Sequence, residues 1–249
     1  MAGHVIRPIP LYKGENLSPY IMTYLMGLLP PQNFAFYIWY IEGPKKKVAV
    51  DAGVTTAGLA LFLSIIAPGA TVMEVQSLEQ GLGKFGLKPE EIDIVILTHL
   101  HPDHVELAWK FTNAKFIVQR RELDFAFNPQ PAFAAFYTRA LFEGLDFEVV
   151  DGDKEVVNGV KVLLTPGHTA GGQSVAVETD AGIAVITGFC CVRQNFEPPE
   201  MIAGFVPVLP IGIHQDVLEA FDSALKVKGI ADIVVPLHEA EYVERDRIP

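Results

Sequence analysis

The run His99-Leu100-His101-Pro102-Asp103-His104 gathers four potential metal ligands within six residues. Neutral imidazoles bind zinc and other divalent ions, and a carboxylate can complete such a site. His99 and His101 are two residues apart, so in an extended segment both rings point to the same side and can reach one ion. Asp103 and His104 follow where the chain turns and can bind a second ion beside it. The run therefore predicts a metal centre.

The elements around this run place it at the edge of a sheet. Residues 92–97 form an apolar run typical of a strand buried on both faces, so the histidines lie on a loop at its carboxyl end, where sites are usually built. Pro166-Gly167-His168 follows another predicted strand, and the strand 233–236 leads to His238. Further strands are predicted at 34–41, 47–51, 114–118, 147–150, 154–157, 160–164, 174–178 and 183–187, and helices at 74–86, 105–111, 120–147 and 215–228. The alternation predicts an α/β fold in which helices cover two sheets, an αββα sandwich.

Composition limits the class of protein. Half of the 249 residues are hydrophobic, which is enough for a sizeable core. The net charge of −11, without a basic stripe, argues against a nucleic-acid partner. The N-terminal residues show no signal-peptide pattern and the apolar runs are too short to span a bilayer, so we expect a soluble, cytoplasmic protein without a membrane partner. Cys190 and Cys191 are adjacent, which disfavours a disulfide and favours a metal, catalytic or core role.

The histidine run resembles the metallo-β-lactamase superfamily, whose hydrolases carry the pattern H-x-H-x-D-H. The resemblance extends from residues 48–53 to His238. Segments 111–120, 165–169 and 195–197 are similar to its N-acyl-homoserine lactonase branch. The resemblance implies one domain over residues 1–249, with two mixed β-sheets flanked by helices.

The same resemblance implies roles for single residues. It implies that one group of three residues binds a first metal ion and that another group of three binds a second. The cofactors would then be two divalent ions, with zinc favoured. Asp51 would orient a ligand imidazole through its other nitrogen. The implied ligands are His99, His101 and His168 for the first ion, and Asp103, His104 and His238 for the second.

Two positions depart from the lactonase pattern. Cys190 stands where lactonases place the aspartate that bridges the two metals, and no acid lies between Asp180 and Glu197. A thiolate is a good zinc ligand, so we expect Cys190 to bind the second ion together with Asp103 and His238, with His104 near both ions; the alternative is a small hydrophobe in the core. Arg193 stands where lactonases carry a tyrosine. It either stabilises an oxyanion or binds a substrate carboxylate, which would favour a lactone with a polar or anionic group, or it lies on the surface.

The predicted activity is opening of a lactone or related ester by a metal-bound hydroxide. Arg193 would assist the oxyanion, and Asp103 could carry the proton to the leaving alkoxide. The apolar segment 20–36 and the Phe-rich segment 120–147 would line a hydrophobic pocket, or pack as core or as the face of a homodimer. A thioester or β-lactam hydrolase, a mononuclear iron dioxygenase and a non-catalytic binding protein stay open as alternatives.

Overall fold

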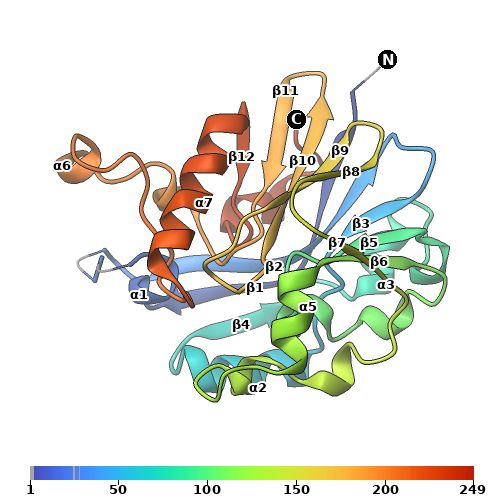
Figure 1. Cartoon of the computed structure of the whole chain (residues 1–249), viewed down its shortest axis with the longest axis horizontal. Helices are drawn as coiled ribbons and strands as arrows, with labels where there is room; N and C mark the ends of the chain where they lie inside the picture. Colours follow the sequence, from blue (N-terminus) through green and yellow to red (C-terminus); the bar gives the residue numbers. More distant parts are fainter. Residues whose placement is uncertain (1–2, 25, 28) are drawn as a thin grey trace.

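Two mixed β-sheets pack face to face, with helices on both outer faces (Figure 1). This arrangement is seen in a computed structural model that describes residues 3–24, 26–27 and 29–249. Three separate hydrophobic clusters fill the layers. One lies between the two sheets and includes Trp39, Val50 and Ile96 from the first sheet and Val162 and Ile186 from the second. The other two lie between each sheet and its helices. The predicted αββα sandwich is therefore confirmed.

The first sheet has seven strands in the order β4-β1-β2-β3-β5-β6-β7. Antiparallel pairs join β1 to β2 and β4, and β2 to β3, whereas β3, β5, β6 and β7 run parallel. The strands are β1 (Val5–Leu17), β2 (Gln32–Glu42), β3 (Val48–Val50), β4 (Thr71–Glu74), β5 (Ile94–Ile96), β6 (Lys115–Gln119) and β7 (Phe147–Val150). Because β3 and β5 are parallel neighbours, the residues that follow them meet at one edge of the sheet.

The second sheet has five strands in the order β12-β11-β10-β9-β8. Its pairs are antiparallel except for β11 and β12. The strands are β8 (Lys154–Val157), β9 (Val160–Leu164), β10 (Gln173–Thr179), β11 (Gly182–Ile186) and β12 (Ile233–Val235). These strands agree with the predicted ones to within about two residues at each end.

The helices α2, α3 and α5 cover the first sheet, and α7 covers the second (Figure 1). The α-helices are α1 (Pro19–Met22), α2 (Thr56–Ile66), α3 (Leu78–Gly83), α4 (Pro102–Val105), α5 (Arg120–Phe127), α6 (Glu200–Ala203) and α7 (Val217–Ile230). Side chains cap the longer helices: Thr55 accepts from the Gly58 amide, and Asp216 accepts from two amides at the start of α7. None of the helices in the described ranges is long and apolar enough to cross a membrane.

Five parts of the chain differ from the prediction. Strand β1 and helix α2 were not predicted as such, and the helix predicted at 74–86 is shorter, because its first residue belongs to β4, which pairs with β1. The predicted helix 105–111 is replaced by α4 and a 3-10 turn at Ala108–Lys110. The predicted helical region 120–147 contains α5 and two further 3-10 turns, at Ala134–Phe136 and Arg139–Leu141.

Candidate metal centre

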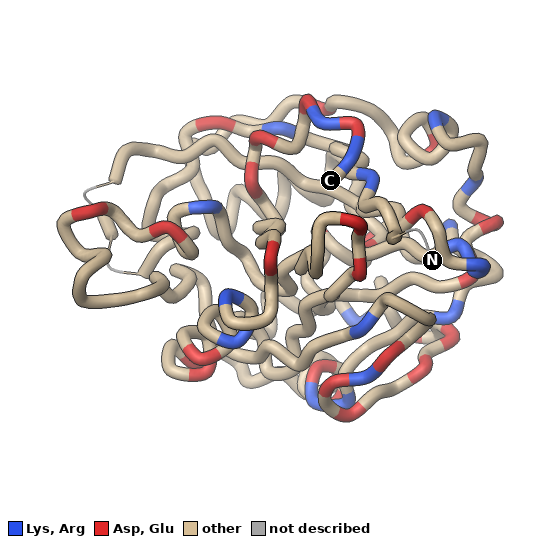
Figure 2. The backbone as a smooth tube through the Cα atoms, turned by 90° about the horizontal axis from the view of Figure 1, so that it is seen from above, with Lys and Arg blue, Asp and Glu red and all other residues tan. Residues whose placement is uncertain are grey.

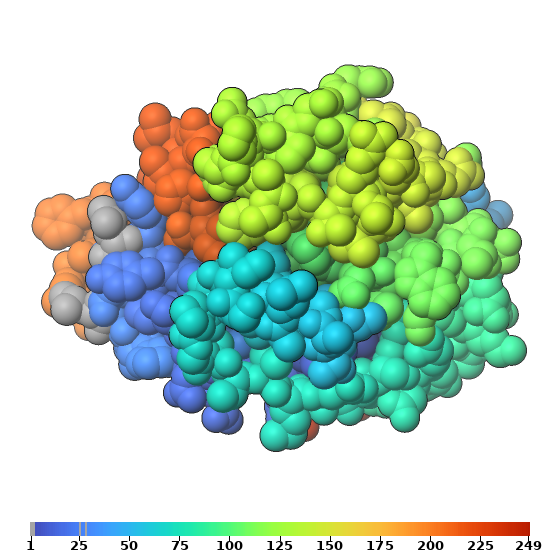
Figure 3. Space-filling view, turned by 90° about the horizontal axis from the view of Figure 1, so that it is seen from below, coloured from blue at the N-terminus to red at the C-terminus, as the bar shows by residue number. Residues whose placement is uncertain are grey.

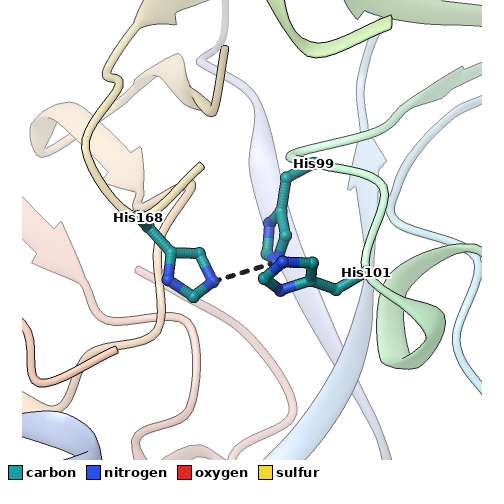
Figure 4. Close-up of side chains that lie close together, drawn as sticks. All are labelled: His99, His101 and His168. Carbon is teal, nitrogen blue, oxygen red and sulfur yellow. Dashed lines mark hydrogen bonds between the residues drawn. The ribbon is translucent and has the colours of Figure 1, made fainter. Parts of the chain in front are cut away.

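Three histidines from two loops form the first group of candidate ligands. His99 and His101 follow β5, and His168 follows β9 (Figure 4). One nitrogen from each ring lies within 4.8 Å of the others. The Nε2 atoms of His99 and His168 are 3.2 Å apart. Two nitrogens bound to one tetrahedral zinc ion lie about 3.3 Å apart, so these two rings are spaced as ligands of a single ion.

The second group lies beside the first. Asp103 and His104 belong to the single turn of α4, and His238 follows β12. Their ligand atoms also lie within 4.8 Å of one another. The rings of His99 and His104 are 4.2 Å apart between centroids, so the two groups are neighbours. The structure thus brings together all six histidine and aspartate residues that the sequence indicated.

Backbone carbonyls fix the orientation of two of the imidazoles. His168 Nδ1 lies 2.6 Å from the Ile213 carbonyl oxygen, and His238 Nδ1 lies 2.9 Å from that of Ala35. A carbonyl oxygen only accepts, so each Nδ1 carries the proton and each Nε2 keeps its lone pair. That tautomer is the one a metal ligand needs.

The Asp51 carboxylate fixes the orientation of the His104 imidazole in the same way. It follows β3 and is completely buried, and its Oδ2 lies 2.8 Å from His104 Nδ1. The Thr98 amide and hydroxyl donate to the same carboxylate, at 2.7 Å and 2.9 Å. Because its hydrogen is used there, the Thr98 hydroxyl can accept from His99 Nδ1 at 3.1 Å. Asp51 thus contacts one of the candidate ligand imidazoles, and its role in orienting a metal ligand stays a prediction.

Burial keeps four of the imidazoles neutral. Desolvation, followed by the neighbouring imidazoles, holds the pKa of His99 well below its usual value, and desolvation does the same for His101. Desolvation lowers the pKa of His168 and of His238 to about 4. Neutral imidazoles are the form that binds metal.

Carboxylates reverse this effect at His104. Burial lowers its pKa, but the carboxylates of Asp103 and Asp51 together outweigh burial and raise the pKa to about 10. Burial raises the pKa of Asp103, yet the neighbouring imidazoles, with His104 first, bring it below its usual range. Asp103 Oδ1 is buried without a hydrogen-bond partner among the described residues. A buried carboxylate oxygen that lacks a protein partner fits a metal ligand.

A cavity beside these ligands is lined mainly by apolar side chains. Helices α1 and α2 and the segment 128–146 meet on the face that surrounds it (Figure 3). Phe136 stacks on His101 with ring centroids 5.3 Å apart, and Phe62 of α2 lies 6.3 Å from the same ring. The predicted segments 20–36 and 120–147 both contribute to the lining, whereas Phe62 lies outside both segments and was not predicted to line it. Residues 25 and 28 of the first segment lie outside the described residues.

Cys190 lies on the wall of this cavity and is buried. Its Sγ contacts Met22 Sδ at 3.5 Å and is not a member of either ligand group. Burial, and then the nearby Asp103 carboxylate, hold the thiol pKa well above its usual value. Cys191 points elsewhere, to the Thr187 hydroxyl at 3.0 Å. The cysteine that the sequence favoured is therefore the one at the cavity, and its ligation of a metal stays a prediction.

The expectation that Arg193 assists the chemistry is wrong in this structure. Its guanidinium forms ion pairs with Glu241 and, at 4.0 Å, with Glu197. The side chain is 44% exposed and lines a separate surface groove. A 3-10 turn at Arg193–Asn195 explains the placement, because it turns Asn195 inward, where the amide donates to the Met22 carbonyl oxygen, and leaves Arg193 outside.

Comparisons with known proteins agree with this geometry. The family model described as Metallo-beta-lactamase superfamily matches residues 33–235. An N-acyl homoserine lactonase of Bacillus thuringiensis is 29% identical over 187 residues, which are 72% of this chain and 73% of that protein. One of Bacillus cereus is 30% identical over 181 residues, covering 70% and 71%.

A solved structure extends the similarity to the whole fold. It is an N-acyl homoserine lactone hydrolase with the product N-hexanoyl-L-homoserine bound at its catalytic metal centre. It superposes with a TM-score of 0.76 and 25% sequence identity, over 98% of this chain and 96% of that chain.

Proposed function

The chain belongs to the metallo-beta-lactamase superfamily, and we propose that it is a metal-dependent hydrolase that opens a lactone or a related ester carrying an apolar acyl group. The observation that carries this proposal is the pair of buried ligand groups at the end of an apolar cavity. The relatives are lactonases by name, and the match to them runs along most of both chains.

The six grouped residues are proposed to hold two divalent ions. Nitrogen and carboxylate donors at these spacings suit zinc. Bound ions would lower the pKa of a water molecule towards neutrality and polarise the ester carbonyl. Asp103, proposed as a ligand of the second ion, would also take a proton and pass it to the leaving alkoxide. The proposed ligands are His99, His101 and His168 for one ion, and Asp103, His104 and His238 for the other, with Cys190 as a further ligand of the second.

The cavity lining supports an uncharged substrate. Among the described residues that line the cavity, none is a lysine or an arginine. Phe34, Phe36, Phe62 and Phe136 instead offer aromatic surface next to the ligands. Since Arg193 lies elsewhere, the described lining offers no lysine or arginine side chain to an anionic group on the acyl part of the substrate. We therefore propose lactones with an apolar acyl chain as the preferred class.

A metal and substrate assay tests the proposal. The purified protein should contain a divalent ion, chelation should abolish hydrolysis, and zinc, manganese or cobalt should restore it. His101→Ala or His168→Ala should remove the first ion and lower the rate by several orders of magnitude. A panel of acyl lactones, open esters, thioesters and β-lactams should show the fastest turnover with the lactones. Full activity of a verified metal-free sample would overturn the proposal, and a preference for thioesters or β-lactams would change the substrate class.

A homodimer is the proposed assembly. The side chains of Tyr20, Met201 and Phe205 are highly exposed, Phe205 by 86%. The segments that carry them are joined, since the Tyr24 amide donates to the Pro210 carbonyl oxygen. Charged residues of both signs are spread along the chain (Figure 2), and we propose these exposed apolar side chains as the contact between copies. Light scattering of Phe205→Ser should then report a monomer. A cytoplasmic location stays a prediction from the sequence.

A further inference from the structure

Glu122 is a completely buried carboxylate near the start of α5. Its partners are three uncharged donors. Oε1 accepts from the Leu100 amide at 3.0 Å and from the Tyr137 hydroxyl at 3.4 Å, and Oε2 accepts from the Gly171 amide at 3.0 Å. Burying a carboxylate without a cation is unfavourable, so a role for it beyond stability has to be sought.

The two amides belong to the two loops that carry the first ligand group. Leu100 lies between His99 and His101, and Gly171 follows His168 by three residues. The second loop packs directly on the helix, because a Cβ atom at Gly171 would lie 2.1 Å from the Glu122 backbone nitrogen. One carboxylate therefore joins the backbones that present all three histidines.

Tyr137 extends the same network to the side of the ligands. Its ring lies 5.3 Å from that of His101, and its hydroxyl accepts from Gln215 Nε2 at 3.2 Å. The Gln215 backbone amide in turn donates to the Gly167 carbonyl oxygen at 2.7 Å, next to His168. Through Tyr137 and Gln215, the network thus makes a second connection to the His101 ring and to the loop that carries His168.

We propose that Glu122 is a positioning residue that fixes the two loops at the spacing the three-histidine metal site requires. It touches neither substrate nor metal. Both carboxylate oxygens are used, so a glutamine keeps one acceptor and turns an NH₂ group towards a backbone N–H. The backbone N–H of one loop then loses its acceptor and faces the NH₂ group, which is a second donor. Changes of this kind around a metal site lower metal affinity by about 10- to 100-fold. The inference rests on the proposed metal site.

The test measures zinc affinity in a chain that keeps only the first site. The parent is His238→Ala, which lacks a ligand of the second group, and zinc is titrated in competition with a chromophoric chelator. Adding Glu122→Gln should raise the zinc Kd by about 10- to 100-fold. The matched control is Asp124→Asn, an exposed acid of the same helix, which should leave the Kd unchanged. Equal Kd values for the parent and Glu122→Gln would overturn the inference.

Two further measurements separate positioning from simple stability. Thermal unfolding of the metal-free proteins reports loss of packing. The zinc Kd is then measured well below the Tm of the metal-free variant, where the protein is folded, and a positioning role predicts that the Kd still differs from that of the parent. If Glu122→Gln does not fold, Tyr137→Phe provides the test, because it removes only one of the donors to Glu122. It should raise the zinc Kd a few-fold, and an unchanged zinc Kd of Tyr137→Phe would overturn the inference. A parent that binds no zinc would overturn both this inference and the proposed function.

Discussion

Asp51→Asn replaces one carboxylate oxygen by an NH₂ group and tests how the second metal site is built. Asp51 adopts a left-handed backbone conformation with φ of 61°, which asparagine tolerates as well as aspartate does. The Asn side chain has the same shape, so the backbone and the packing stay as they are. Alanine would be a poorer choice, because it adds about 1–2 kcal/mol of strain at a left-handed position.

The magnitude follows from the hydrogen bonds. The Thr98 amide donates to Oδ1, so in the variant the amide oxygen must stay there and the NH₂ group faces His104 Nδ1. Two donors cannot face each other, so in the variant His104, once neutral, carries its proton on Nε2 instead of Nδ1. The nitrogen directed at Asp103 then lacks the lone pair that a metal ligand needs. Losses of this kind lower metal affinity by about 10- to 100-fold, which corresponds to about 1.4–2.7 kcal/mol.

Competition with a chelator measures this loss directly. The parent and Asp51→Asn are stripped of metal and titrated with zinc, and the variant should lose the second ion first. Hydrolysis of an acyl lactone at limiting zinc should fall with zinc occupancy. Excess zinc should restore part of the rate. Two ions bound with parental affinity by a folded Asp51→Asn protein would refute the reasoning about His104.

Three other predictions concern the cysteines, the arginine and pH. In the cobalt-substituted protein, Cys190→Ser should remove an intense near-ultraviolet thiolate band and reduce metal content towards one ion per chain. The control Cys191→Ser should do neither. Two tightly held ions in Cys190→Ser would show that the Cys190 thiol only packs in the core. Arg193→Ala should leave kcat/KM for acyl lactones within about two-fold, because the side chain is engaged at the surface; a loss of several hundred-fold would contradict this. In the metal-free protein the folded state keeps His168 and His238 neutral down to about pH 4, whereas the unfolded chain protonates them below about pH 6.5. The free energy of unfolding in urea should therefore fall as the pH decreases from 6.5 to 4, and a constant value would count against buried neutral rings.

The grouping of His99, His101, Asp103 and His104 could be predicted because its signal is local, whereas His168 and His238 were assigned from the family resemblance. Strand β5 is a short apolar run, the histidines follow it directly, and residues two apart in an extended segment share a side. The role of Asp51 was implied by the family resemblance, and the structure gives the physical reason for its position. It ends a strand that runs parallel to β5, so both chain ends reach the same edge.

Long-range pairing hid other parts of the fold. Strand β1 contains Pro8 and Pro10, which argue against a strand because proline has no amide to donate. The structure accommodates them because β4 pairs with Tyr12–Glu15, beyond both prolines. The position of Arg193 could be counted along the chain, but its direction depends on a turn that buries Asn195 instead.

Glu122 shows most clearly what a single sequence does not contain. It lies in a short helix among charged residues, where an acid is ordinarily on the solvent face. The backbone amides of Leu100 and Gly171 donate to the Glu122 carboxylate only because the fold brings their loops close to it. These two residues are 22 and 49 positions away from Glu122 along the chain. A metal site of this kind is therefore specified twice. Four of the proposed ligands lie in a local motif, whereas we propose that a buried acid from a third element sets the spacing of the loops that carry the three-histidine group.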